Sequence, residues 1–79
     1  MNILKKEKTE LVTYLWDMKK GIYFANVDLR EERYEFTTNI KKAYPFSDSQ
    51  ELMVERLINT LAHKGHGSFI RYSEKVKRR

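Results

Sequence analysis

The stretch SDSQELMVERLINTLAHKG, residues 47–65, has the clearest secondary-structure pattern in the chain. Ser47 and Gln50 have the spacing of a capping box, in which each side chain bonds to the backbone N–H of the other residue at the start of a helix. Gly65 suits the left-handed conformation that commonly follows the last helical turn. Between these ends, six apolar residues recur at helical spacing: Met53, Val54, Leu57, Ile58, Leu61 and Ala62. The pattern predicts one amphipathic helix with a single apolar face.

Four segments outside this helix have the composition or the alternation of β-strands. Between the first two, Asp17 can bond the backbone amides ahead of it and Gly21 can supply a positive φ, so we expect a hairpin. The predicted strands are residues 11–16, 22–27, 33–40 and 68–72. The expected fold class is α+β: a small antiparallel sheet, made of a three-stranded meander plus a short last strand, packed on one amphipathic helix in the order βββαβ.

An alternative makes residues 9–20 a helix. Leu11, Leu15, Met18 and Ile22 have helical spacing, and the basic residues before Gly21 would suit a helix C-terminus. Short apolar runs are ambiguous between helix and strand, so the sequence leaves this alternative open.

The 79 residues predict a single domain, 1–79, because two domains of half that length could not bury adequate cores. The chain has no cysteine, which excludes disulfides and thiolate metal sites and is compatible with the cytoplasm, the compartment we expect. No apolar run approaches the length of a membrane helix, and residues 1–8 lack the apolar stretch of a signal peptide. No membrane partner is therefore expected.

The formal net charge of +5 is concentrated at the two ends of the sequence. Residues 1–8 carry a net +2 and residues 74–79 a net +3, whereas residues 9–73 contain nine basic and nine acidic residues. Charge runs of this kind are usually solvated, so both ends, about 1–8 and 74–79, are expected to be basic and flexible. Their other interpretation is as basic arms that contact phosphate or an acidic partner.

The predicted hairpin sorts side chains into two faces, if Trp16 lies opposite Ile22. One helix covers only one face of a small sheet, and the covered face is expected to hold Trp16, Ile22, Phe24, Phe36 and Ile40. The uncovered face would then expose an apolar patch, which usually marks an interface. The predicted interface residues are Leu11, Leu15, Tyr23 and Val27. The alternative is that Ile3 and Leu4, or Phe69 and Tyr72, cover this face.

No set of residues predicts catalysis. His63 and His66 are poorly spaced as a metal pair and lack further ligands, and His63 suits the negative end of the helix dipole. Ser47 and Ser49 have no neighbouring base, and the glycines near His66 follow a helix, whereas phosphate-binding loops precede one. We expect no enzyme activity, no metal, no cofactor and no small-molecule substrate.

The first functional hypothesis is therefore a small non-catalytic binding module that acts through protein–protein contact, with a partner protein or with its own copy. An inhibitor or accessory factor of a nucleic-acid enzyme would suit a neutral body with basic ends. The alternative hypothesis is a small DNA- or RNA-binding protein that uses its charged ends and exposed aromatic residues. The residues predicted for that role are Lys5, Lys6, Lys41, Lys42, Arg71, Lys75, Lys77, Arg78 and Arg79.

Overall fold

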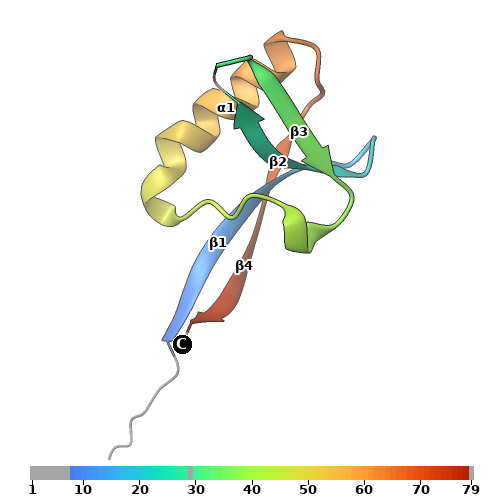
Figure 1. Cartoon of the computed structure of the whole chain (residues 1–79). Coiled ribbons are helices and arrows are strands. Elements are labelled where there is room, and N and C mark those ends of the chain that lie inside the picture. Colours follow the sequence, from blue (N-terminus) through green and yellow to red (C-terminus); the bar gives the residue numbers. More distant parts are fainter. Residues whose placement is uncertain (1–7, 29, 79) are drawn as a thin grey trace, which may run out of the picture.

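The computed structural model describes residues 8–28 and 30–78, which form a four-stranded antiparallel sheet and one α-helix (Figure 1). The strands lie in the order β3-β2-β1-β4. In chain order, the elements are β1 (Lys8–Asp17), β2 (Ile22–Asp28), β3 (Arg33–Thr37), the 3-10 turns η1 (Ile40–Lys42) and η2 (Asp48–Gln50), α1 (Glu51–His63) and β4 (Ile70–Arg78). The predicted α+β class and the order βββαβ are confirmed. The alternative helix over residues 9–20 is wrong, because that segment forms β1 and the turn after it.

Asp17 organises the turn between β1 and β2. Its Oδ1 accepts hydrogen bonds from the backbone N–H groups of Lys19 and Lys20 at 3.0 and 3.2 Å. Its carbonyl oxygen accepts one from Gly21 at 2.7 Å, and Gly21 has a φ of 67°. The predicted roles of the aspartate and the glycine are therefore confirmed.

The predicted register of this hairpin is wrong by one residue. Trp16 pairs with Tyr23, and Asp17 pairs with Ile22, because the turn contains four residues between its paired ends and not five. Successive strand residues face opposite sides of a sheet. A shift of one residue between two strands therefore changes which side chains of the first strand share a face with those of the second.

The predicted capping box forms at η2, the 3-10 turn that leads into α1, and the predicted glycine ends α1. The N–H of Ser47 donates to Oε1 of Gln50 at 2.9 Å, and both halves of the capping box are present. At the C-terminal end, the N–H of His66 donates to the carbonyl oxygen of Leu61 at 2.9 Å, and Gly65 has a φ of 82°. This hydrogen bond across a left-handed glycine is a common way for a helix to end.

The core lies between α1 and one face of the sheet, which we call the inner face. Its buried side chains are Leu15, Phe24, Phe46, Val54, Leu61 and Phe69. A β-bulge between Phe24 and Asn26 changes the alternation of β2, so Phe24 and Val27 both pack on the inner face although they are three residues apart.

The segment before α1 fills a gap between β1 and β2. Residues of β1 and β2 pair directly at two positions next to the turn, Trp16 with Tyr23 and Asp17 with Ile22. Farther along, Thr13 and Phe46 exchange two backbone hydrogen bonds of 2.9 Å, and the N–H of Tyr44 donates to the carbonyl oxygen of Phe24 at 3.0 Å. This insertion brings the ring of Phe46 onto the ring of Phe24, with their centroids 6.0 Å apart.

The lengths of the last two strands differ from prediction. β3 ends at Thr37 and not at Ile40, because Asn39 begins η1 by accepting a hydrogen bond from the N–H of Lys41 at 3.0 Å. β4 is longer than the predicted segment 68–72 and continues to Arg78, paired with β1 over nine residues. Residues 74–78 therefore lie in a strand, where β1 supplies backbone partners. The other predicted flexible end lies outside the described residues except for Lys8.

No helix within the described ranges is long and apolar enough to cross a membrane.

Candidate functional site

The face of the sheet turned away from α1, the outer face, carries a row of aromatic side chains. Leu15 belongs to the inner-face core, so its neighbours Tyr14 and Trp16 lie on the outer face. The register places Tyr23 opposite Trp16, and Tyr72 opposite Tyr14. Side chains that are directly opposite in antiparallel strands share a face. We call Tyr14, Trp16, Tyr23 and Tyr72 the outer aromatic cluster.

The rings of the outer aromatic cluster contact one another across three strands. The rings of Trp16 and Tyr23 have centroids 4.6 Å apart, and Tyr14 meets Tyr23 edge-on at 6.4 Å. Tyr14 and Tyr72 are nearly parallel, with centroids 6.3 Å apart and an interplanar angle of 27°. Such ring pairs hold the side chains in fixed orientations on the sheet.

The segment 40–43 covers one part of the outer face and leaves another part open. Ala43 is buried against Val12 and Tyr14, and Ile40 packs beside them. Beyond this cover, Tyr72 is 43% exposed, and Ile70, which pairs with Trp16, is 48% exposed. The open part thus presents an aromatic ring and an apolar side chain to the solvent.

Glu74 affects the two stacked tyrosines. Its charge is the main cause that raises the pKa of Tyr72, and its Oε1 also accepts a long hydrogen bond of 3.4 Å from the Tyr72 hydroxyl. The pKa of Tyr14 is also raised, first because the ring is partly removed from water and second because of Glu74. Both effects favour the neutral phenol over the phenolate.

We expect Glu74→Gln to lower the pKa of Tyr72 toward 10, and that of Tyr14 by less, because burial is the main cause for Tyr14. Both tyrosines bind their protons more tightly in the folded state, so the stability they contribute is complete below about pH 10. That contribution is lost as the pH rises through the raised pKa values. Titration of tyrosinate absorbance measures the change, with Tyr72→Phe and Tyr14→Phe to identify the transitions of these two among the five tyrosines. Glu35→Gln removes an exposed acid elsewhere and should leave both pKa values unchanged.

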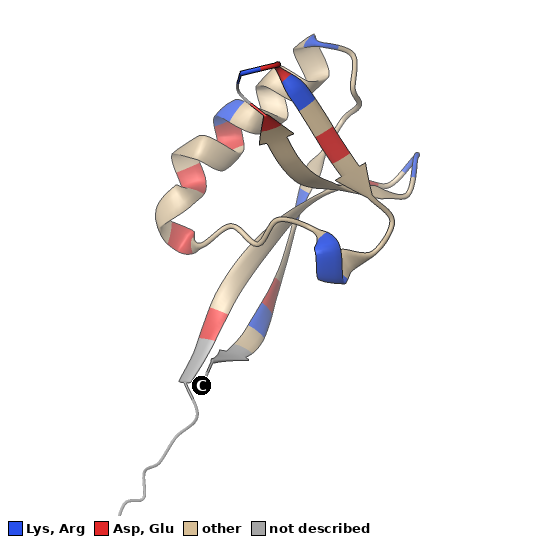
Figure 2. Ribbon diagram, in the orientation of Figure 1, with Lys and Arg blue, Asp and Glu red and all other residues tan. Residues whose placement is uncertain are grey.

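β1 and β4 extend past the rest of the sheet as a two-stranded ribbon (Figure 1). We define the ribbon as residues 8–12 and 74–78, which the register pairs from Val12–Glu74 to Lys8–Arg78. The ribbon contains four basic residues, Lys8, Lys75, Lys77 and Arg78, and two acidic residues, Glu10 and Glu74. Strand pairing therefore brings basic residues from near both ends of the sequence into one element. Figure 2 shows that η1, with Lys41 and Lys42, lies beside the strands from which the ribbon extends.

The four predicted interface residues do not form one surface. Leu15 is 0% exposed in the core, and Val27 packs against the same core. Tyr23 lies on the outer face. Leu11, which is 40% exposed, is four residues before Leu15 in β1 and therefore lies on the inner face with it. The register error explains why Leu11 and Leu15 are separated from Tyr23, since it exchanges the faces of β1 relative to β2, and the β-bulge explains why Val27 lies on the inner face. The register error also means that Trp16 does not lie on the face that α1 covers. Ile40, which the sequence pattern assigns to that face as well, lies in η1 and packs on the outer face.

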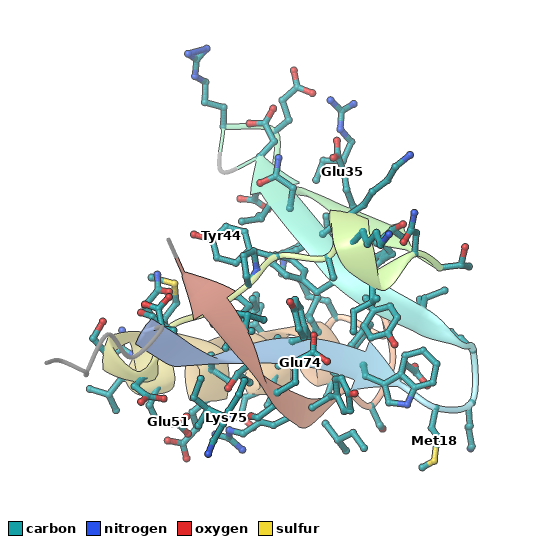
Figure 3. All side chains as sticks on the ribbon, turned by 90° about the horizontal axis from the view of Figure 1, so that it is seen from below. Met18, Glu35, Tyr44, Glu51, Glu74 and Lys75 are labelled. Atoms are coloured by element: carbon teal, nitrogen blue, oxygen red, sulfur yellow. The ribbon has the colours of Figure 1, made fainter. Side chains whose placement is uncertain are left out.

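The residues predicted for nucleic-acid binding lie in two described groups, at Arg71, and, as a third group, outside the described residues. Lys75, Lys77 and Arg78 belong to the ribbon, and Lys41 and Lys42 are exposed in η1. Arg71 is bonded to Glu51 at the start of α1, and Figure 3 shows Lys75 on the same side of the sheet as Glu51. Among the described residues, Lys41, Lys42 and Lys75 make no ion pair. The third group, Lys5, Lys6 and Arg79, lies outside the described residues.

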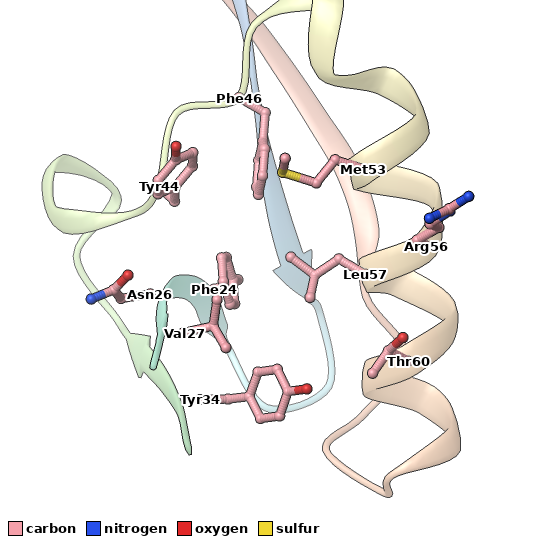
Figure 4. Close-up of a pocket in the computed structure, with 10 residues that line it drawn as sticks. All are labelled: Phe24, Asn26, Val27, Tyr34, Tyr44, Phe46, Met53, Arg56, Leu57 and Thr60. Carbon is pink, nitrogen blue, oxygen red and sulfur yellow. The ribbon is translucent and has the colours of Figure 1, made fainter. Parts of the chain in front are cut away.

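An apolar groove of about 380 Å³ lies between α1 and the β2–β3 pair. The side chains of Phe24, Met53 and Leu57 face it, whereas the guanidinium group of Arg56 points away from it (Figure 4). The groove therefore has an apolar wall but no lining charge directed into it, and it does not indicate a particular ligand. Within residues 8–28 and 30–78, no group of three His, Cys, Asp or Glu side chains is placed to hold a metal ion.

Comparison of the chain with protein-family models, curated proteins and solved structures found no match. A functional proposal therefore depends on the ribbon and the outer aromatic cluster.

The sequence pattern does not predict the outer aromatic cluster, because it assigns Trp16 to the face that the helix covers. The one local signal for it is the Asp17 turn, whose bonds to Lys19 and Lys20 fix the register that puts Trp16 beside Tyr23.

Proposed function

We propose that this chain is a nucleic-acid-binding module that contacts phosphate groups with the β1–β4 ribbon. The observation that carries the proposal is the strand pairing of Lys8 with Arg78 and of Thr9 with Lys77. It brings four basic residues from near the two ends of the sequence into one element that also holds Glu10 and Glu74, while residues 9–73 as a whole are neutral. Basic residues gathered on one narrow element are a common feature of proteins that bind phosphate backbones.

The shape of the ribbon is compatible with this role. A two-stranded β-ribbon is narrow enough to enter the major groove of a duplex, and it can equally lie along a single strand. Lys41 and Lys42 add two exposed positive charges on η1, which packs on the outer face through Ile40. Phosphate contact at η1 would bring a nucleic acid next to the outer aromatic cluster.

A salt titration of oligonucleotide binding tests the proposal. Fluorescence polarisation of labelled strands of about 12 nucleotides is expected to give micromolar or tighter binding at about 50 mM salt. The affinity should fall steeply toward about 200 mM, with a logarithmic slope near −3 if about four phosphates are contacted. Absence of binding at low salt would contradict the proposal.

The second candidate function is contact with a protein, the role that the sequence predicts first. The observation that favours it is the outer edge of β4, since this strand pairs with β1 on one side and is the last strand of the sheet. An unpaired edge beside Ile70 and Tyr72 can accept a strand from a partner or from a second copy. Basic side chains along β4 oppose self-association, because like charges would face one another. This candidate becomes the preferred one if the salt titration detects no nucleic acid.

A further inference from the structure

We infer that the outer aromatic cluster makes this module selective for single-stranded nucleic acid, by stacking unpaired bases on the exposed rings. The inference rests on the proposed function, because the ribbon supplies the phosphate contacts. In a duplex, each base is already stacked between its neighbours, and its flat face is not accessible to a side chain on the protein surface. A single strand can turn its bases outward onto aromatic rings.

The ring of Tyr72 is prepared for this role by its surroundings. One face of it lies near Tyr14, which is buried, at 6.3 Å between centroids, and its hydroxyl donates to Glu74. The ring nevertheless remains 43% exposed. A side chain that is already fixed loses little conformational entropy when a base stacks on it.

Trp16 and Ile70 continue the apolar surface next to Tyr72. The indole of Trp16 lies against the ring of Tyr23, and Ile70 pairs with Trp16 on the other side. The surface therefore has room for a base beside the one on Tyr72. Trp16 is the only tryptophan in the sequence, so its fluorescence reports on this face alone.

Two exposed lysines beside the cluster are placed to attract phosphates. Lys41 and Lys42 lie on η1, which packs on the outer face through Ile40. Lys75 pairs with Leu11 and lies on the inner-face side of the ribbon, so it does not flank the rings. Glu74 is the acidic residue bonded to Tyr72, and it keeps phosphates away from the ring itself. Single-strand binding proteins use this arrangement, in which bases stack on aromatic rings and basic residues contact the phosphates.

Three probes of about 12 nucleotides separate base stacking from charge: oligo(dT), an abasic strand with the same phosphates, and a duplex. Charge alone favours the duplex, because its phosphates are denser. Stacking predicts instead that oligo(dT) binds at least about tenfold more tightly than either of the other probes and quenches the fluorescence of Trp16. Tyr72→Leu should lower the affinity for oligo(dT) about tenfold, to the level of the abasic strand, and Tyr72→Phe, which keeps the ring, should retain it.

Tyr44→Leu is the matched control, because Tyr44 is 38% exposed but contacts Phe24 and Phe46 away from the outer face. It should leave the preference for oligo(dT) unchanged. Affinity for oligo(dT) that is no higher than for the abasic strand or the duplex, with no change in Trp16 fluorescence, would overturn the inference and leave the phosphate-binding function standing. Failure of all three probes to bind would overturn both.

Discussion

Gly67→Ala is expected to lower the free energy of unfolding by about 3 kcal/mol, a large part of the stability of a domain this small. A Cβ at this position would lie far inside van der Waals contact with Oδ2 of Asp17. Asp17 is 3% exposed and its other oxygen is bonded to Lys19 and Lys20, so the carboxylate cannot move aside without losing the turn. Gly67 also has a φ of 136°, which is unfavourable for any residue with a side chain.

Gly65→Ala is the matched control for this substitution. Gly65 has a φ of 82°, but nothing lies within 4 Å of a Cβ built there. Its replacement should therefore cost only the strain of the left-handed conformation, about 1 kcal/mol. Urea unfolding of the two variants measures the difference. In a chain that already carries Asp17→Ala, the further loss of unfolding free energy caused by Gly67→Ala should fall toward the loss caused by Gly65→Ala. Equal losses for the two glycines would show that the Asp17 carboxylate yields easily.

The turn around Asp17 shows which part of the fold is predictable from the sequence and which is not. The capping box of Ser47 and Gln50 and the turn of Asp17 and Gly21 act within a few residues, so residue type and spacing predict them. The residue types do not say whether four or five residues separate the paired ends of that turn, and the register prediction is wrong by that one residue. The close approach of the buried Asp17 carboxylate to Gly67, fifty positions later in the chain, is also absent from any local pattern.

The candidate site depends on further long-range features. The bulge that brings both Phe24 and Val27 to the inner face, and the insertion of Phe46 beside Thr13, are settled by packing in the core. The basic residues of the ribbon are recognisable in the sequence, but their meeting depends on β4 pairing along the full length of β1. A short last strand, as predicted, would have left the two charged ends unconnected.

Reversing three charges of the ribbon, by Lys75→Glu, Lys77→Glu and Arg78→Glu together, is expected to lower nucleic-acid affinity by at least about 100-fold at low salt. Each substitution replaces an attraction to phosphate with a repulsion, and the salt dependence should become correspondingly flatter. Fluorescence polarisation with the same oligonucleotides at several salt concentrations measures both quantities. The substitutions lie on an edge strand where charged side chains are well tolerated, so folding should be retained.

The matched control reverses three charges at the opposite end of the molecule: Arg30→Glu, Arg33→Glu and Lys64→Glu. These residues lie in the β2–β3 turn, at the start of β3 and at the end of α1, which Figure 1 shows far from the tip of the ribbon. Arg33 and Lys64 make only exposed ion pairs, with Glu31 and Glu32, whose loss costs little stability. Both triple variants change the net charge equally, so binding governed by overall charge would weaken equally in the two. Binding at the ribbon would weaken strongly in the first variant and by less than about tenfold in the second, since remote charges are screened by salt.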